Sequence, residues 1–379
     1  MMDNLWLTSA VWIGLALASS LISIRLALSV ALIEIMVGAL GGNLIGLPLT
    51  PWVNYLAGFG AILLTFLAGA EVDMQVVRRN VGASIGIGVV SFLLPYVGCM
   101  LAARYLLGWP WPQAQIAGIS LSTTSVAVVY AVMVETGLNK TELGKIILAA
   151  CFITDLGTVL ALGIVFASFT AWLLAFAAAT IVTAWLLPTV APWFFAKVGR
   201  RVSEPDLKFL LLLLFALGGF ATTVGSEAVL PAYVIGMALS PAFQRDPELP
   251  HRLRVIAFTV LTPFYFLKAG SLVEASVLVS GAALIALFLG LKMATKFVGI
   301  LPITYYYRFG NREGMYTTLL MSTGLTFGSI SALYGLSHNI IDQQQYTILL
   351  TAVIASAVVP TVIAQKWFLP KIEPAKQEV

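Results

Sequence analysis

Charged residues are scarce in this chain of 379 residues. Asp, Glu, Lys and Arg together make up 10% of the sequence, whereas hydrophobic residues make up 60%. The two histidines, His251 and His338, are too few for a histidine metal centre or a catalytic triad. The two cysteines, Cys99 and Cys151, both lie in apolar stretches, so we interpret them as small apolar side chains and not as a disulfide or a metal site.

Long polar segments are also missing. The sequence breaks into about thirteen apolar stretches of roughly 16–29 residues, and about 20 apolar residues in helical form cross a bilayer core. The stretches are 6–24, 26–45, 52–70, 81–107, 113–135, 143–168, 170–198, 207–222, 227–243, 251–273, 276–304, 312–337 and 344–368. We therefore predict an all-α polytopic membrane protein with about thirteen transmembrane helices. Residues 1–370 would form one transmembrane domain in the lipid bilayer, and residues 371–379 a short cytoplasmic tail.

Basic residues alternate between successive loops. One set of turns carries most of them: Arg25, Arg78, Arg79, Lys140, Lys145, Lys197, Arg200, Arg201, Lys208, Arg245, Arg252, Arg254, Arg308, Arg312, Lys366, Lys371 and Lys376. The alternate turns carry none, around residues 46–51, 108–112, 169, 223–226, 274 and 338–343. Because short basic loops stay in the cytoplasm, we predict an external N-terminus, a cytoplasmic C-terminus and a location in the cell (plasma or inner) membrane. A soluble helical protein would not segregate its charges in this way. The formal charge of +4 is explained by these loops, so no nucleic-acid partner is expected.

Two lysines lie well inside an apolar stretch. Lys292 and Lys296 fall within 276–304, and their spacing of four residues puts both on one helix face. A charge near the bilayer centre costs roughly 2.5–3.5 kcal/mol on insertion scales unless it is paired or faces water. At least one of them therefore needs an acidic partner or a hydrated cavity. Two other cations are less informative, because Arg104 is expected to snorkel to the interface and Lys268 is compatible with either role.

Glu34 and Asp155 are the acids that lie away from the ends of the apolar stretches. Asp155 has Thr154 and Thr158 as its polar neighbours. A carboxylate in such a place can exchange a proton for a hard cation, because carboxylate and hydroxyl oxygens suit both. A purely structural role for a single intramembrane acid is the alternative, but a lysine inside the membrane favours function.

Polar and glycine residues interrupt two of the apolar stretches. The interruptions are 122–125 (STTS) and 322–329 (STGLTFGS). Matched interruptions in two halves of a chain indicate a transporter site built from broken helices. Because the two segments lie in the fifth and the twelfth stretch, seven positions apart, they would cross the membrane in opposite orientations, as inverted repeats require. Close helix packing through small residues is the alternative explanation.

Several motifs together resemble a known family. Residues 120–163 (SLSTTSVAVVYAVMVETGLNKTELGKIILAACFITDLGTVLALG) resemble the core of the monovalent cation:proton antiporters, in the branch of the Kef and NapA proteins. Residues 31–42 (ALIEIMVGALGG) resemble the Gly-Glu span that opens the family's first repeat, and residues 66–73 (FLAGAEVD) resemble its Gly-x-Glu-x-Asp signature. Residues 295–299 (TKFVG) resemble the Thr-Lys-x-x-Gly of the helix that carries its intramembrane lysine.

The resemblance implies exchange of Na⁺ or K⁺ for protons on the NapA/NhaA-like fold, with two crossing broken helices and no cofactor. Asp155 would be the carboxylate that binds the alkali cation or the proton, and Lys296 would pair with it, with Lys292 as second choice. The other implied site residues are Thr154, Thr123 and Thr124 as cation ligands, Ser125, Ser322, Thr323 and Gly324 as parts of the broken helices, and Glu34 as an accessory group.

The resemblance also implies a homodimer with an elevator mechanism. A moving core of residues 81–168 and 276–368 would slide past a dimerisation or scaffold domain of residues 6–70 and 170–273. The first stretch and the leucine-rich 207–222 would be candidates for the dimer interface.

Two positions depart from the family's pattern. Thr154 stands where relatives carry Asp, Asn or Gln, so the proton-to-cation ratio of members with two aspartates does not transfer to this chain. Thr323-Gly324-Leu325 stands where many relatives place Arg-Gly-Glu, which leaves the ion selectivity open.

Three other functions compete with this interpretation. A sodium-coupled organic anion carrier of related inverted-repeat architecture is the first alternative, and a passive channel is another. An intramembrane enzyme is disfavoured, because the sequence has no His-Glu helix motif, no paired catalytic aspartates and no reactive cysteine context.

Overall fold

A computed structural model describes most of the chain as helices. The described residues are 4–26, 30–70, 81–138, 141–166, 171–199, 201–224, 228–246 and 248–370, and every regular element in them is a helix. Within these ranges, ten helices are long and apolar enough to cross a membrane. The predicted all-helical, multi-pass membrane architecture is therefore confirmed, while the number of crossings stays a prediction. The end of the 66–73 signature, the basic residues Arg78, Arg79, Lys140, Arg200, Lys371 and Lys376, and the tail 371–379 lie outside the described residues.

The helices belong to two compact units, residues 1–74 with 159–276 and residues 75–158 with 277–379. The first unit contains α1 (Leu5–Leu26), α2 (Val30–Ile45), α3 (Pro51–Ala70), α9 (Ala171–Val198), α10 (Pro205–Thr223), α11 (Val229–Arg245), α12 (Glu248–Ile256), η2 (Ala257–Leu261) and α13 (Thr262–Ser271). The second contains α5 (Val81–Tyr105), α6 (Trp111–Ser122), α7 (Val126–Glu135), most of α8 (Glu142–Val165), most of α14 (Ala275–Ser280), α15 (Ala282–Tyr306), α16 (Asn311–Met321), α17 (Thr326–Ser337), α18 (Gln343–Ile363) and η3 (Ala364–Phe368).

In the first unit, glycines let helix backbones touch. α13 packs against α2, and α11 packs against α3. A Cβ atom on Gly270 of α13 would collide with the carbonyl oxygen of Ile35 on α2, and one on Gly236 of α11 would collide with that of Phe66 on α3. Small residues that allow such close approach are the usual means by which helices associate in membranes. The first unit is therefore a set of closely crossed helices.

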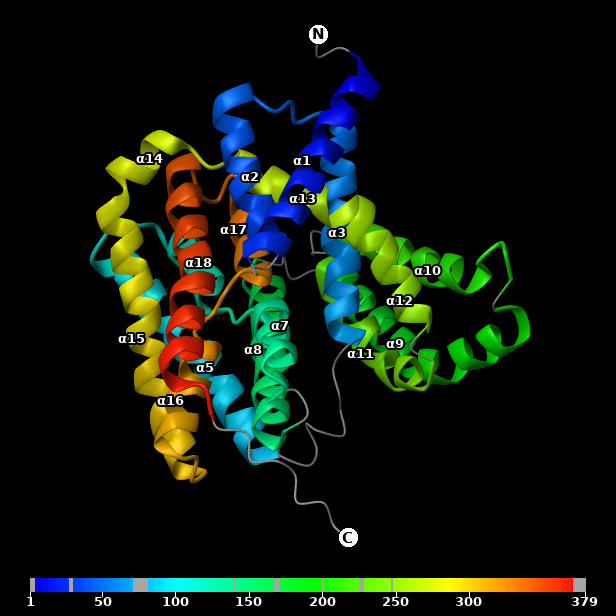
Figure 1. Cartoon of the computed structure of the whole chain (residues 1–379). Coiled ribbons are helices and arrows are strands. Elements are labelled where there is room, and N and C mark those ends of the chain that lie inside the picture. The colour runs from blue at the N-terminus through cyan, green and yellow to red at the C-terminus, as the bar shows by residue number, and fades with distance from the viewer. Residues whose placement is uncertain are drawn as a thin grey trace. The chain divides into compact units, whose positions relative to one another are not determined.

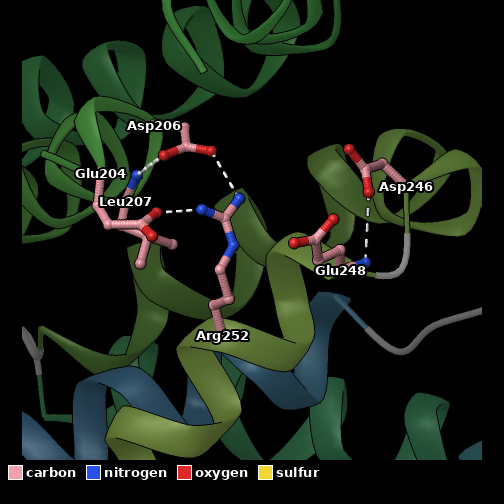
Figure 2. A network of polar contacts seen from close by, with 6 residues as sticks. All are labelled: Glu204, Asp206, Leu207, Asp246, Glu248 and Arg252. Carbon is pink, nitrogen blue, oxygen red and sulfur yellow. Dashed lines mark hydrogen bonds and ion pairs between the residues drawn. The ribbon is translucent and has the colours of Figure 1, made fainter. Parts of the chain in front are cut away.

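An ion network joins α10 and α12 in the same unit. The guanidinium group of Arg252 binds Glu204 and donates a hydrogen bond of 2.7 Å to Asp206 Oδ2 (Figure 2). Glu204 is the N-cap of α10 and has a left-handed backbone (φ 49°), which is costly for a residue with a Cβ. Asp206 is almost fully buried and also accepts a bond from Leu207 N. Because removing one partner would leave a buried charge unpaired, the network fixes how α10 begins.

The second unit is built around α15. α15 packs against α5, α16 and α18, and Figure 1 shows this unit as the cyan-to-teal helices α5–α8 and the yellow-to-red helices α14–α18. α18 begins with a capping box, in which Asp342 accepts a hydrogen bond of 2.7 Å from Gln345 N and the Gln345 side chain binds back to Asp342 N. At an end of α5, Arg104 donates to Trp109 O and lies over the Trp111 ring, a position compatible with the snorkelling predicted for it.

Both interrupted helices lie in this unit. The predicted stretch 113–135 is broken between α6 and α7 at residues 123–125, and the stretch 312–337 is broken between α16 and α17 at residues 323–325. Thr123 ends α6 with an extended backbone (φ −64°, ψ 153°). The sequence predicts both interruptions because hydroxyl side chains offer the backbone hydrogen bonds that compete with the helix.

Candidate ion site at two interrupted helices

The two breaks contact each other directly. Ser125 N donates a hydrogen bond of 3.2 Å to Thr323 O, and the hydroxyl of Thr124 donates one of 2.8 Å to Met321 O, the last residue of α16. Residues 122–125, 322 and 323 are all fully buried. One backbone N–H and two carbonyl oxygens at the breaks are thus satisfied by the opposite segment, as irregular backbone buried in a membrane protein requires.

Hydroxyl groups also close the ends of the first halves. Ser122 Oγ donates to Ile119 O and Thr123 Oγ1 to Ser120 O at the end of α6. Ser322 Oγ donates to Thr318 O and Thr323 Oγ1 to Leu320 O at the end of α16. These bonds use the hydroxyl hydrogens, so the oxygen lone pairs remain as acceptors.

Asp155 is buried on α8 and is only 1% exposed. Among the described residues, its Oδ1 atom has no hydrogen-bond partner. Cys151, one turn earlier, lies with its Sγ 3.5 Å from the Sδ atom of Met321 at the end of α16. Since residues four apart share a helix face, Asp155 lies on the same face of α8 as Cys151, which contacts the end of α16.

Thr154 does not use its hydroxyl hydrogen in the site. Its Oγ1 atom has two acceptors for its one hydrogen, Gly88 O of α5 at 3.1 Å and Ala150 O at 3.0 Å. Thr158 Oγ1 in turn donates to Thr154 O. The Thr154 oxygen can therefore bind a cation, but Thr154 does not add a second titratable group beside Asp155.

Lys296 is fully buried and binds the first break. Its Nζ atom donates to Ser91 Oγ at 2.7 Å, Ser122 O at 2.9 Å and Thr124 Oγ1 at 3.0 Å. Three acceptors match the three donors of an ammonium group. The described part of the chain contains no ion pair between Lys296 and Asp155 within 4.0 Å. The direct pair that we predicted is not formed in this arrangement and stays a prediction for another state of the site.

Lys292 has a different partner. It is also fully buried, and its Nζ atom donates to Ser356 Oγ of α18 at 2.9 Å. Gly324 lies against it, because a Cβ atom there would collide with Lys292 Nζ. The structure thus brings together Lys292, Lys296 and the two breaks within one unit.

Glu34 and Lys268 belong to the first unit. Glu34, on α2, is 2% exposed, and its Oε2 has no hydrogen-bond partner among the described residues. Lys268, on α13, is half-buried. Their predicted functions stay predictions.

Two serines of the site were missed by the sequence analysis. Ser91 on α5 binds Lys296, and Ser356 on α18 binds Lys292. Each is one hydroxyl in an apolar stretch, and such a residue usually bonds the carbonyl of its own helix, so its identity alone carries no signal. Only the positions of the two lysines in the folded protein identify Ser91 and Ser356 as members of the site.

Interrupted helices that meet beside buried charged groups are the construction of secondary transporters. The comparisons with known proteins agree. The family described as "Sodium/hydrogen exchanger, transmembrane" matches residues 12–368, and the chain belongs to this family. Its members transport ions, so the prediction of a cation:proton antiporter relative that is not an enzyme is confirmed at the level of the superfamily.

Individual relatives extend along most of the chain. It is 29% identical over 350 residues to the probable Na⁺/H⁺ antiporter 3 of Methanocaldococcus jannaschii, covering 88% of each protein. It is 26% identical over 402 residues to the Na⁺/H⁺ antiporter NhaS4 of Synechocystis, covering 96% of this chain and 95% of that protein. The solved structure of the sodium proton antiporter MjNhaP1 of M. jannaschii matches with a TM-score of 0.71 at 16% identity, covering 96% of this chain and 100% of that one, which shows a shared fold.

Proposed function

We propose that this protein exchanges a monovalent cation, Na⁺ or K⁺, for protons, with Asp155 as the carboxylate that both ions share. The observation that carries the proposal is the burial of Asp155, with an unpartnered oxygen, on the same face of α8 as Cys151, which contacts the end of α16. Membership of the sodium/hydrogen exchanger family supports it. K⁺ is included because a relative in Bacillus cereus, 25% identical over 246 residues (60% of this chain, 62% of that protein), is named the Na⁺/H⁺-K⁺ antiporter GerN.

Mutual exclusion at one carboxylate is sufficient for exchange. A cation at Asp155 would complete its shell with the oxygens of Thr154 and Thr124 or with water, since alkali ions are hard and prefer oxygen. A proton at Asp155 would neutralise the same group, so a cation and a proton could cross the membrane on this carboxylate only in turn, and an uncompensated carboxylate inside the bilayer would be costly.

Lys296 would compensate Asp155 when no cation is bound. Its ammonium group would leave part of its present hydrogen bonds to Ser91, Ser122 and Thr124 and approach the carboxylate. The entry of a cation would reverse this step, since like charges near one carboxylate repel each other. Lys296 would thereby link the binding of an ion at Asp155 to the hydrogen bonds at the break between α6 and α7.

Alternating access would follow an elevator mechanism. The unit of residues 75–158 and 277–379 would be the moving core, and the unit of residues 1–74 and 159–276 the scaffold of a homodimer, with α1 and α10 as candidate interfaces. The two broken helices would be corresponding parts of inverted repeats. The N-terminus would lie outside the cell and the C-terminus in the cytoplasm. Within the family, the chain would belong to the Kef/NapA branch.

Transport in everted vesicles tests this function. Addition of Na⁺ or K⁺ should dissipate a preformed pH gradient in vesicles with the wild-type protein, and Asp155→Asn should abolish the response, because the amide binds neither ion as a carboxylate does. Glu142→Gln, an exposed acid at the start of the same helix, should retain the response. Activity of Asp155→Asn equal to that of the wild type would reject the assignment, and a response only to organic anions with Na⁺ would indicate an organic anion carrier.

A further inference from the structure

The exchange scheme gives Lys296 a role but leaves Lys292 without one. Both lysines are fully buried on α15, one helical turn apart. Lys296 binds oxygens of α5 and of the α6–α7 break, whereas Lys292 binds Ser356 on α18. A second buried ammonium group carries an energetic cost that needs a compensating function.

Gly324 explains where the Lys292 ammonium group lies. A Cβ atom at position 324 would collide with Lys292 Nζ and would lie 2.9 Å from Thr123 Oγ1. The ammonium group therefore occupies the space that a side chain at position 324 would fill, at the point where the two breaks approach each other. Glycine is the residue that leaves this space free.

Ser356 connects Lys292 to the backbone of the second break. The Ser356 oxygen accepts the hydrogen bond from Lys292 Nζ and donates to Val353 O at 2.7 Å, with Gly324 O as a more distant acceptor at 3.5 Å. α15, α18 and the α16–α17 break thus meet at one ammonium group. Because α16 ends at Met321, the negative end of its dipole faces this region, where a positive charge is favourable.

We propose that Lys292 is a positioning residue, whose ammonium group fills the space beside Gly324 and, through Ser356, holds the break between α16 and α17 in the geometry that the ion site needs. Lys292 does not touch the transported ion in this assignment; it acts through Ser356 and Gly324. The transport part of its test rests on the proposed exchange function, whereas the packing part does not.

The first experiment compares two matched variants, Lys292→Met and Lys296→Met, in proteoliposomes with equal amounts of folded protein. Misplacing a site by about 1 Å can cost a hundredfold in rate, so we expect Lys292→Met to lower the turnover about ten- to a hundredfold. Since Lys292 does not contact the ion, the apparent KM for the cation should change less than about threefold. The midpoint of the pH profile should move less in Lys292→Met than in Lys296→Met, because Lys296 is the group near the shared carboxylate in the proposed scheme.

The second experiment is a double-mutant cycle with Gly324→Ala and Lys292→Ala, measured as thermal unfolding in detergent without any transported ion. Gly324→Ala alone should lower the unfolding midpoint, because its methyl group collides with the ammonium group. In the Lys292→Ala background the same substitution should be better tolerated, because the nearest colliding atom is gone and only the contact with Thr123 remains. The control is Gly290→Ala on α15, the helix of Lys292. Nothing lies within 4 Å of the Cβ position of Gly290.

The outcomes separate the two claims. A wild-type protein without exchange would reject the proposed function, and the cycle would still measure the contact between Lys292 and Gly324. Additive effects in the cycle, a Lys292→Met variant with full turnover, or a Lys292→Met variant that shifts the pH midpoint as Lys296→Met does would each overturn the positioning role.

Discussion

At the scale of single residues, the hydrogen bonds of the buried polar groups limit what each can do. Thr154 binds the carbonyl oxygens of Gly88 and Ala150, so it holds α8 against α5, and the lone pairs of its oxygen remain as acceptors. Asp155 keeps an oxygen without a partner among the described residues. A buried acceptor of this kind is costly unless an ion, a proton or water satisfies it. Of the two neighbouring residues, Asp155 therefore titrates and Thr154 does not.

Sequence identifies the charged members of the site and misses the neutral ones. Asp155 and Lys296 are conspicuous because ionisable residues inside apolar stretches are rare and expensive. Which oxygens satisfy Lys296 depends on how α5 and the α6–α7 break pack against α15, and that packing is not encoded by any local pattern. The same reason explains why the predicted contact between Lys296 and Asp155 is replaced here by bonds to Ser91, Ser122 and Thr124.

Replacing Lys296 by Gln tests the coupling between the two groups. The amide keeps the ability to donate hydrogen bonds but removes a positive charge near Asp155. Loss of that charge favours the neutral carboxyl group, so we expect the pH profile of exchange to shift toward alkaline pH by about one unit. The measurement is the dissipation of the pH gradient across a pH series, with Lys268→Gln in the other unit as the control. An unchanged profile for Lys296→Gln would move suspicion to Lys292.

At the scale of helices, the apolar stretches predict where the helices lie but not where a helix is widened or divided. The stretch 251–273 is in fact α12, the π-helical η2 and α13, and Pro263 lies in the first turn of α13. Proline has no N–H to donate to the preceding turn, which accounts for the widened turn before it. Likewise, the stretch 276–304 divides at Gly281 into α14 and α15. Counting apolar residues along the sequence detects neither the π-helical turn nor the division at Gly281.

Glycine contacts between α2 and α13 predict a difference between two otherwise similar substitutions. Gly270→Ala should destabilise the protein by about 1–3 kcal/mol, because the new methyl group collides with Ile35 O and the helices must separate. Gly14→Ala on α1 in the same unit has nothing within 4 Å of its Cβ position, so it should be neutral or stabilising by up to about 1 kcal/mol.

Thermal unfolding in detergent measures both variants under the same conditions. Equal unfolding midpoints for Gly270→Ala and Gly14→Ala would show that the close crossing of α2 and α13 does not exist in the folded protein.

At the scale of the whole molecule, the division into units follows contacts that sequence cannot supply in full. The first predicted core segment ends at residue 168, whereas the compact unit ends at residue 158, inside α8. A helix that contributes to two bodies shows no change of composition at the boundary. The functions of the two units, as moving core and as scaffold, therefore remain predictions for experiments on the whole protein.

The alternation of basic loops predicts the orientation of the chain. Cys99 and Cys151 are free and buried, so new cysteines can be labelled against a low background. A membrane-impermeant maleimide added to intact cells should label Gln344→Cys, which lies exposed near the loop 338–343 that we predict to be external. It should not label Arg201→Cys in the basic loop before α10 unless the cells are opened. The reverse pattern would show that the N-terminus is cytoplasmic.

The central claim is that one carboxylate binds either a proton or the transported cation. In purified protein in a weakly buffered solution, addition of the transported ion, Na⁺ or K⁺, should release protons, because the cation displaces the proton from Asp155. Asp155→Asn should release none, and Glu142→Gln should behave as the wild type. Equal proton release from Asp155→Asn, or binding of the transported ion by the wild type with no release at any pH, would contradict the account.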